Sequence, residues 1–296
     1  MRVVVTGASG FAGTWLCRQL VASERVVIGW VRQVPAEPVP GVRYRVQDIR
    51  DREGCKVAMR ADEPARVFHL AAMTHVSSCE ADGVAAHDAN VRGTHNVLSS
   101  MPAQAVGLFS STCHVYGRPQ RLPIDEHHPT FPVGTYARTK LEAEEVACQA
   151  HPKVVIARAF HHTGPGQASR YALAGWAEQL ARDVRPIRVG DLGLRRDYTD
   201  VRDICRGYRL LLEKGQAHGR YNLCSGESLP LSELLRLLAD GTPPETTQES
   251  ARVRADDVPD FRGDPGRAKA LGWRPEVTLS VSLAELRAGF SPPGHP

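Results

Sequence analysis

The stretch Gly7-Ala-Ser-Gly10-Phe-Ala-Gly13 stands between an apolar run of strand length, Arg2–Thr6, and a helical pattern, Thr14–Val21. Glycines at such a junction allow a tight turn, and the amides at the start of the helix can bind a pyrophosphate. A strand before the glycines and a helix after them is the context in which the pattern predicts a dinucleotide site. A tight turn without a ligand is the alternative. We expect the site to use Gly7, Ser9, Gly10, Phe11, Ala12 and Gly13.

Outward from this turn, apolar runs alternate with helical patterns through the first half of the chain. The alternation predicts a parallel sheet covered on both faces, a Rossmann-like doubly wound α/β fold. After Gly164-Pro-Gly166 the pattern changes to helices with short, irregular strands, which predicts a smaller mixed α/β substrate lobe. We expect strands at 26–31, 42–47, 66–70, 106–110, 154–159 and 221–224, and helices at 87–100, 136–151 and 231–238.

The domain limits follow from this change of pattern. Residues 1–163, with about 197–226, are expected to form the dinucleotide-binding domain. Residues 164–196 and 227–290 are expected to form the second lobe, and 291–296 a loose tail.

Composition excludes several classes of protein. No apolar run reaches the roughly 18 residues of a membrane span, and no signal-peptide pattern follows Met1, so we expect a cytoplasmic protein without a membrane partner. The seven cysteines are scattered, which favours reduced thiols over a zinc site or a disulfide frame. A net charge of +4 without a dense basic stripe argues against nucleic acid and fits an anionic small molecule.

The residue after the second predicted strand indicates which dinucleotide binds. NAD sites place an acidic residue there, whereas NADP sites use an arginine for the 2′-phosphate. This strand ends in Trp30-Val31-Arg32, so we predict NADP(H), with NAD(H) as the alternative. Arg32 as a solvated loop charge is the other interpretation. Further along, the ends of the next strands are expected to contact the cofactor through Asp48, Ile49, Leu70, Ala71 and Ala72.

Tyr136 and Lys140 are the candidate chemical pair. Residues four apart share one face of a helix, so the ammonium can lower the pKa of the phenol. A proton donor that faces a bound hydride carrier can interconvert an alcohol and a ketone.

Several further motifs occur in a fixed order along the chain. These are His69-Leu-Ala-Ala72, Asn90-Val-Arg-Gly-Thr94, Ser110-Ser-Thr-Cys-His-Val-Tyr-Gly117 and, in the second half, Gly164-Pro-Gly-Gln167, Arg196-Asp-Tyr-Thr-Asp-Val-Arg-Asp203 and Asn222-Leu-Cys-Ser-Gly226. Together with the glycine turn and the Tyr136/Lys140 pair, they resemble the nucleotide-sugar branch of the extended short-chain dehydrogenases/reductases. The second half resembles the group of GDP-mannose 4,6-dehydratases and GDP-6-deoxy-4-keto-mannose reductases.

The resemblance implies a role for individual residues. Thr112 would bind the substrate oxygen at the reacting carbon, Tyr136 would be the acid/base, and Lys140 would lower the tyrosine pKa and bind the nicotinamide ribose. His162 would contact the cofactor. The substrate would contact Thr74 and His161, with Arg196 and Arg254 as a diphosphate clamp. A surface salt bridge is the alternative role of each arginine, whereas Asp200 and Asp203 are expected to hold their loop together.

Departures from the family pattern narrow the activity. The dehydratases have a carboxylate next to Thr112, where this chain has Cys113 and His114, so a plain reductase is the better interpretation. His114 is open between an epimerase-like acid/base and a polar pocket wall. Cys113 is expected to point away from it, because alternate residues of an extended segment face opposite sides. His161 replaces the usual Asn, and a metal site from His161, His162 and His114 lacks supporting spacing, so we expect no metal.

These inferences predict an NAD(P)H-dependent reductase that converts the C4 ketone of an NDP-4-keto-6-deoxyhexose, with GDP as the preferred nucleotide, to an alcohol. The alternatives are an NDP-sugar epimerase and a GDP-mannose 4,6-dehydratase. A cofactor-binding protein without turnover is a weaker alternative, because such proteins commonly lack the Tyr/Lys pair. By analogy with the family, we expect a homodimer that pairs through the helices at 87–100 and 136–151.

Overall fold

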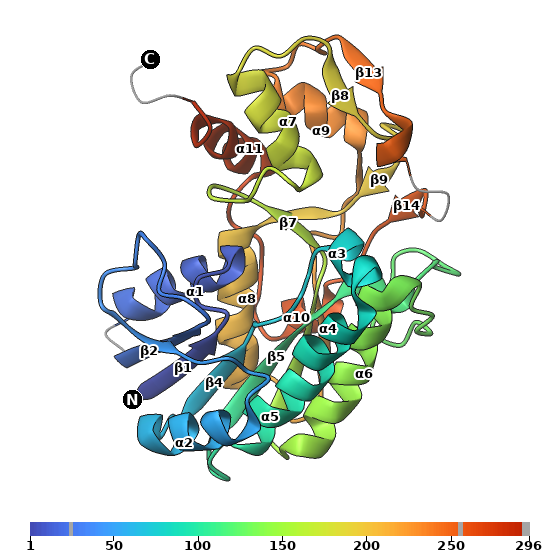
Figure 1. Ribbon diagram of the computed structural model, residues 1–296. Coiled ribbons are helices and arrows are strands. Elements are labelled where there is room, and N and C mark those ends of the chain that lie inside the picture. The colour runs from blue at the N-terminus through green and yellow to red at the C-terminus, as the bar shows by residue number, and fades with distance from the viewer. Residues whose placement is uncertain (24–25, 254–256, 292–296) are drawn as a thin grey trace.

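A parallel sheet of seven strands forms the centre of the molecule (Figure 1). The computed structural model describes residues 1–23, 26–253 and 257–291. The strands are ordered β11-β6-β5-β4-β1-β2-β3, and every neighbouring pair is parallel. Their bounds are β1 Arg2–Thr6, β2 Val26–Val31, β3 Val42–Val46, β4 Arg66–His69, β5 Val106–Thr112, β6 Val154–Ala159 and β11 Arg220–Leu223.

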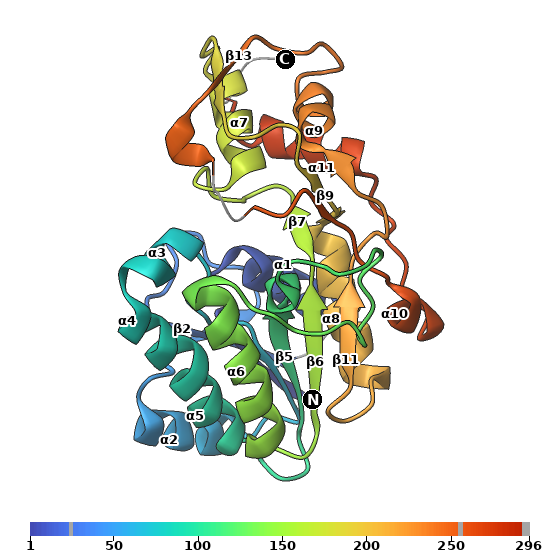
Figure 2. The ribbon, with the colours of Figure 1, turned by 90° about the vertical axis from the view of Figure 1, so that its right-hand side faces the viewer.

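Helices cover both faces of this sheet (Figures 1 and 2). The helices α1 (Phe11–Ala22) and α8 (Val201–Lys214) pack on one face around Leu16, Leu20 and Tyr208. The other face is covered by α2 (Arg52–Asp62), α5 (Gly93–Ser99) and α6 (Gly134–Ala150). Two layers of helices enclosing a parallel sheet explain why its central strands β1 and β2 are almost continuously apolar. The predicted doubly wound α/β fold is confirmed.

Several element limits differ from the prediction. Strand β5 extends two residues beyond the predicted end and finishes at Thr112. The helix predicted over 87–100 is instead α4 (Gly83–His87), a π-helical turn η1 (Asp88–Arg92) and α5, and the short helix α3 (Val76–Ala81) was not predicted. A π-turn has helical periodicity on either side of it, so the apolar spacing does not reveal it.

The second lobe has its own core, built from three helices and a few short strands. The helices are α7 (Ala172–Ala181), α9 (Leu231–Leu238) and α11 (Leu279–Ala288). The short strands pair as β7 His161–Thr163 with β10 Tyr198–Asp200, β8 Ile187–Val189 with β13 Thr246–Gln248, and β9 Arg195–Arg196 between β12 Leu229–Pro230 and β14 Asp260–Phe261. The chain also has the 3-10 turn η3 Ser250–Arg252, the 3-10 turn η2 Cys113–Tyr116 directly after β5, and the helix α10 Gly266–Ala270, which packs beside β11.

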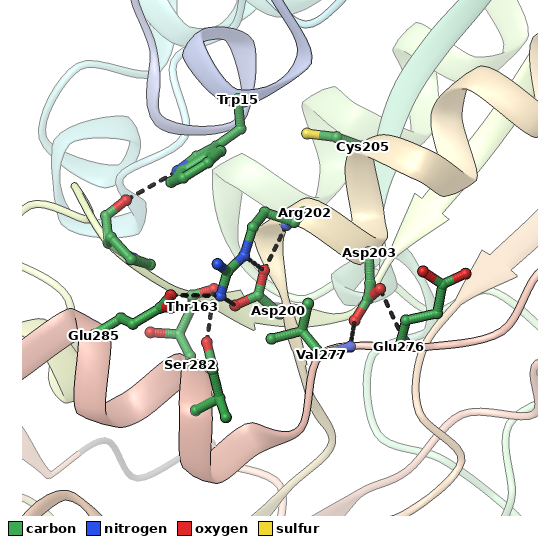
Figure 3. Close-up of polar contacts among 12 residues, drawn as sticks. Trp15, Thr163, Asp200, Arg202, Asp203, Cys205, Glu276, Val277, Ser282 and Glu285 are labelled. Carbon is green, nitrogen blue, oxygen red and sulfur yellow. Dashed lines mark hydrogen bonds and ion pairs between the residues drawn. The ribbon is translucent and has the colours of Figure 1, made fainter. Parts of the chain in front are cut away.

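A polar network joins this lobe to the sheet domain at the start of α8 (Figure 3). Asp200 caps α8 by accepting a hydrogen bond from the Arg202 amide and also binds the Arg202 guanidinium at 2.8 and 2.9 Å. The same guanidinium lies over the Trp15 ring and forms an ion pair of 2.7 Å with Glu285 of α11. One arginine therefore contacts an α1 side chain and an α11 side chain at once.

Asp203, one turn further along α8, binds the segment that leads to α11. Its carboxylate accepts hydrogen bonds of 3.0 Å from the amides of Glu276 and Val277 (Figure 3).

The described residues contain no helix with the length and hydropathy of a membrane span. Of the predicted loose tail, residues 292–296 lie outside the described residues.

Candidate functional site

The glycine turn lies where β1 meets α1. Gly7 has a φ of +69°, which favours glycine, and its carbonyl accepts a hydrogen bond of 2.9 Å from the Gly10 amide. A Cβ on Gly13 would lie 2.1 Å from the Gly7 oxygen, and a Cβ on Gly7 would lie 2.8 Å from the Ala71 nitrogen. Gly10 is the N-cap of α1 and has no side chain to accept a hydrogen bond from the first amides of the helix. No capping side chain therefore competes with a ligand for these amides.

A buried chain of hydrogen bonds fixes the end of β4 beside this turn. The Thr6 hydroxyl bonds the His69 Nδ1 at 2.7 Å and accepts from the Ala71 amide at 3.1 Å, and His69 Nε2 bonds the Thr94 hydroxyl at 3.0 Å. Burial, followed by the Lys140 charge, lowers the pKa of His69 to about 3. His69 is therefore a neutral positioning residue that holds Ala71 against Gly7.

The other predicted cofactor residues line the same edge of the sheet. The Phe11 and His162 rings are stacked with their centroids 6.0 Å apart, and His162 Nδ1 bonds the Phe160 carbonyl at 2.9 Å. Ser9 is exposed, whereas Ala12, Leu70 and Ala72 are partly buried. The Ile49 side chain is buried in the core, which leaves its main chain for any contact with a cofactor.

Arg32 follows β2 as an exposed side chain, and its charge contributes to a lowered pKa of Asp48. The largest cause of that lowering is the hydrogen bond from Arg50, whose guanidinium binds the Asp48 carboxylate at 2.6 Å. Asp48 is thus already paired, and two arginines lie near the ends of β2 and β3. Sequence reasoning missed Arg50, although its position two residues after Asp48 is a usable signal.

The predicted chemical pair lies at the carboxyl end of β5. Thr112 ends the strand, and its hydroxyl is hydrogen-bonded to that of Tyr136 in the first turn of α6. The Lys140 ammonium is buried, donates a hydrogen bond of 2.6 Å to the Ser110 carbonyl and lies 4.1 Å from the centroid of the Phe109 ring. The fold therefore brings Thr112, Tyr136 and Lys140 together. Strand β4, which Ala71 follows, is the neighbour of β5 in the sheet.

The pKa of the phenol differs from the prediction. Burial raises the pKa of Tyr136, opposed by its hydrogen bond with Thr112. Burial also lowers the pKa of Lys140 to about 7, opposed by the Glu144 charge, so the lysine is only partly charged at neutral pH. The predicted depression of the phenol pKa is therefore wrong for this structure. A protonated phenol is the form that donates a proton to a ketone.

Two buried side chains to which the sequence analysis gave no individual role support this centre. Glu144 accepts hydrogen bonds from Ser111 at 2.5 Å and from Arg158 at 2.9 and 2.7 Å. Asn90, in the π-turn, binds both the amide and the carbonyl of Met73 and the hydroxyl of Thr139. The sequence holds a signal for each of them: Glu144 follows Lys140 by four residues, and Asn90 is a polar residue within an apolar helical pattern.

Cys113 does not point away from His114, as alternation along a strand predicted. Ligand atoms of Cys113, His114 and His161 lie within 4.8 Å of one another. The reason is that residues 113–116 form the 3-10 turn η2, in which successive side chains do not alternate. The His114 ring lies 5.9 Å from the Tyr136 ring and 5.6 Å from the His161 ring, centroid to centroid.

The predicted substrate residues lie toward the second lobe. The Thr74 hydroxyl is 3.2 Å from that of Tyr171, which caps α7. The Arg196 guanidinium binds the carbonyls of Arg195 and Val258 and the Asp257 carboxylate. Within the described residues, the ion-pair partner of Arg196 is Asp257. The other predicted clamp residue, Arg254, lies outside the described residues.

Comparison with known proteins agrees with this geometry. Residues 3–224 match the model of the NAD dependent epimerase/dehydratase family. The GDP-6-deoxy-D-mannose reductase of Pseudomonas aeruginosa is 34% identical over 302 residues, which cover 96% of this chain and 95% of that protein.

Solved structures also match over nearly the whole chain. RMD from Pseudomonas aeruginosa complexed with NADPH superposes with a TM-score of 0.84 at 31% identity and 98% coverage of both chains. A UDP-glucose 4-epimerase of Thermus thermophilus in complex with NAD gives a TM-score of 0.87 at 28% identity, with 98% of this chain and 99% of that chain covered.

Proposed function

Since this chain belongs to the NAD dependent epimerase/dehydratase family, we propose that it is a reductase that transfers hydride from NADPH to C4 of a GDP-linked 4-keto-6-deoxyhexose. The observation that carries this proposal is the hydrogen-bonded Thr112/Tyr136 pair at the carboxyl end of β5, with Lys140 buried beside it. Similarity to a GDP-6-deoxy-D-mannose reductase over 96% of the chain supports the choice of substrate.

In this mechanism the first amides of α1, at the glycine turn, would hold the cofactor pyrophosphate, and bound NADPH would supply the hydride. Thr112 orients the sugar carbonyl, and Tyr136 donates a proton to its oxygen as the hydride arrives at carbon. Because the pKa of Tyr136 is raised, the phenol keeps its proton until hydride transfer makes the oxygen of the sugar ketone basic. Lys140 would hold the nicotinamide ribose and would return a proton to Tyr136 after each turnover.

We assign the adenosine 2′-phosphate to Arg32 and Arg50, because guanidinium groups suit phosphate and both flank Asp48. A relative of this chain is solved with NADPH, which favours NADP(H), while other relatives bind NAD. The diphosphate of the sugar nucleotide is assigned to Arg196 and Arg254. To accept it, Arg196 would exchange its bond to Asp257 for one to phosphate.

The direct test is to incubate the purified protein with GDP-4-keto-6-deoxy-mannose and NADPH and to follow NADPH absorbance. Consumption with formation of a GDP-6-deoxyhexose supports the proposal. Turnover of a dTDP-linked ketosugar, with no turnover of the GDP-linked compound, would change the assigned nucleotide of the substrate from GDP to dTDP.

An NDP-sugar epimerase is the second candidate, favoured by the His114 ring 5.9 Å from the Tyr136 ring and by similarity to a UDP-glucose 4-epimerase. If His114 removed a proton next to the ketone, solvent deuterium would appear in recovered substrate. A 4,6-dehydratase would release a 4-keto product from GDP-mannose without added cofactor, and Cys113 and His114 stand where it would need a carboxylate.

We also infer a homodimer that pairs through α5 and α6, the helices by which the family is expected to dimerise. The two helices lie side by side on the outer face of the sheet (Figure 2). Light scattering at several protein concentrations tests this: a dimer mass supports it, and a monomer mass throughout contradicts it.

A further inference from the structure

Three potential metal ligands meet at the edge of the proposed sugar site. Cys113 and His114 come from the turn η2 after β5, and His161 comes from β7, nearly fifty residues later in the chain. One ligand atom from each lies within 4.8 Å of the other two. The Cys113 thiol is buried, whereas the two imidazoles are partly exposed.

His161 presents a nitrogen that lacks a partner. Its Nδ1 atom is buried and makes no hydrogen bond within the described residues. An unsatisfied buried polar atom destabilises the fold, so its presence needs an explanation. The rings of Tyr198 and Phe261, with centroids 5.4 and 6.0 Å from that of His161, restrict how far the imidazole can turn to find a partner.

The set of donors matches one kind of ion. A thiolate with two imidazoles suits Zn²⁺, which takes three protein ligands and leaves a fourth position for water in open sites. Zinc bonds of about 2.0–2.3 Å bring tetrahedral ligand atoms to about 3.3–3.6 Å from one another. The present separations of at most 4.8 Å exceed these values by about 1 Å, so binding needs only small side-chain adjustments and no large turn of the His161 ring.

We propose that Cys113, His114 and His161 bind one Zn²⁺ ion, with water in the fourth position. On binding, the Cys113 thiol forms a sulfur–zinc bond and releases its proton to solvent. This set differs from the one considered on sequence grounds, because His162 instead bonds the Phe160 carbonyl and stacks on Phe11. Cys113 takes its place.

The position of the ion has a consequence that rests on the proposed function. His114 contacts the Tyr136 ring, so a zinc ion held by His114 would lie beside the proposed proton donor and obstruct the sugar. Zinc should therefore inhibit NADPH consumption, and a chelator should restore it.

The primary test measures binding itself and does not depend on turnover. Metal-free full-length protein is titrated with Zn²⁺ in excess Mg²⁺, which occupies oxygen-ligand sites, and bound zinc is counted after dialysis. In parallel, Co²⁺ is bound and its absorption spectrum recorded. We expect one ion per chain and a thiolate-to-cobalt charge-transfer band.

Two ligand variants and a matched control complete the test. Cys113→Ser and His161→Asn should each weaken zinc binding by at least about tenfold, and Cys113→Ser should remove the cobalt band. Cys148→Ser changes a partly buried cysteine outside the cluster and should behave as the unmodified protein. Circular dichroism melts verify that each variant is folded. If a variant does not fold, the cobalt spectrum of the unmodified protein still tests whether a thiolate binds the metal.

Undiminished zinc binding in both ligand variants, or bound Co²⁺ without the band, would overturn the site. Stoichiometric binding that leaves NADPH consumption unchanged would support the metal site and contradict the placement of the sugar beside His114. The two failures are therefore distinguishable.

Discussion

The Arg158 guanidinium donates two hydrogen bonds to the Glu144 carboxylate, at 2.9 and 2.7 Å, and both side chains are buried. Glu144 lies one helical turn beyond Lys140, and its charge opposes the loss of the lysine proton. An ion pair in the interior of the sheet domain thus contributes to the electrostatics of the proposed active site.

Glu144→Gln should lower the free energy of unfolding by about 3–5 kcal/mol, because it leaves Arg158 charged and unpaired in the core. Urea unfolding measures the loss. The double variant Glu144→Gln/Arg158→Met should recover part of it, since the buried charge is then removed. Equal losses in the single and double variants would contradict this account.

Lys140→Met should change how stability depends on pH. In the unfolded chain the lysine has its ordinary pKa of 10.5, whereas the folded value is about 7. Between these values the unfolded state holds the extra proton, so raising the pH favours the folded state, by at most about 1.4 kcal/mol per pH unit. Unfolding free energies of the native protein should therefore rise relative to Lys140→Met from pH 7 to 9. Parallel curves would count against the lowered pKa, and Lys153→Met, at an exposed lysine, is the control.

Tyr136→Phe should reduce turnover by about 10²–10⁴-fold, the usual contribution of a general acid, and leave NADPH affinity within a few-fold. Stopped assays with the ketosugar give the first quantity and fluorescence titration gives the second. A variant with near-normal turnover would exclude the phenol as the proton donor.

Gly13→Ala should weaken NADPH binding by at least about tenfold, or about 1.4 kcal/mol. The new Cβ would lie 2.1 Å from the Gly7 carbonyl oxygen and force the turn open. Gly289→Ala is a suitable control, because its Cβ would approach no atom closer than 3.4 Å. Isothermal titration compares the two, and unchanged affinity in Gly13→Ala would argue that the turn does not bind the cofactor.

Arg50→Ala, alone and with Arg32→Ala, should weaken NADPH binding by about tenfold to a hundredfold, as expected for lost charged hydrogen bonds of about 1.5–3 kcal/mol. NADH affinity should change little, because NADH lacks the 2′-phosphate. Dissociation constants for both cofactors decide the matter, with Arg52→Ala on the exposed start of α2 as control. Equal losses for NADPH and NADH would refute the assignment.

The sequence predicted the features that depend on local pattern. The doubly wound sheet follows from alternating runs, and the positive φ of Gly7 fits a glycine whose place in the turn was already evident. The approach of Thr112, Tyr136 and Lys140 was predicted from motif order. Family membership could be inferred from the same motifs.

Features that depend on backbone detail or on distant partners were not predictable in this way. The turn η2 brings Cys113 and His114 to one side, and only the pairing of β7 with β10 fixes His161 beside them. The pKa of Tyr136 depends on how much protein surrounds it, which spacing on a helix cannot tell. The pairing of Arg196 with Asp257 joins residues 61 positions apart.

The return of the chain from the second lobe to the sheet limits how the molecule can be dissected. Strand β11 completes the sheet beside β6, and α8 packs against α1. A fragment that stops at Thr163 would lack an edge strand and would expose the apolar surface that Tyr208 and its neighbours cover. An exchange of the second lobe with that of a relative must therefore replace two separate segments and keep residues 201–223 of the host, because a single cut would remove β11 and α8 from the sheet they complete.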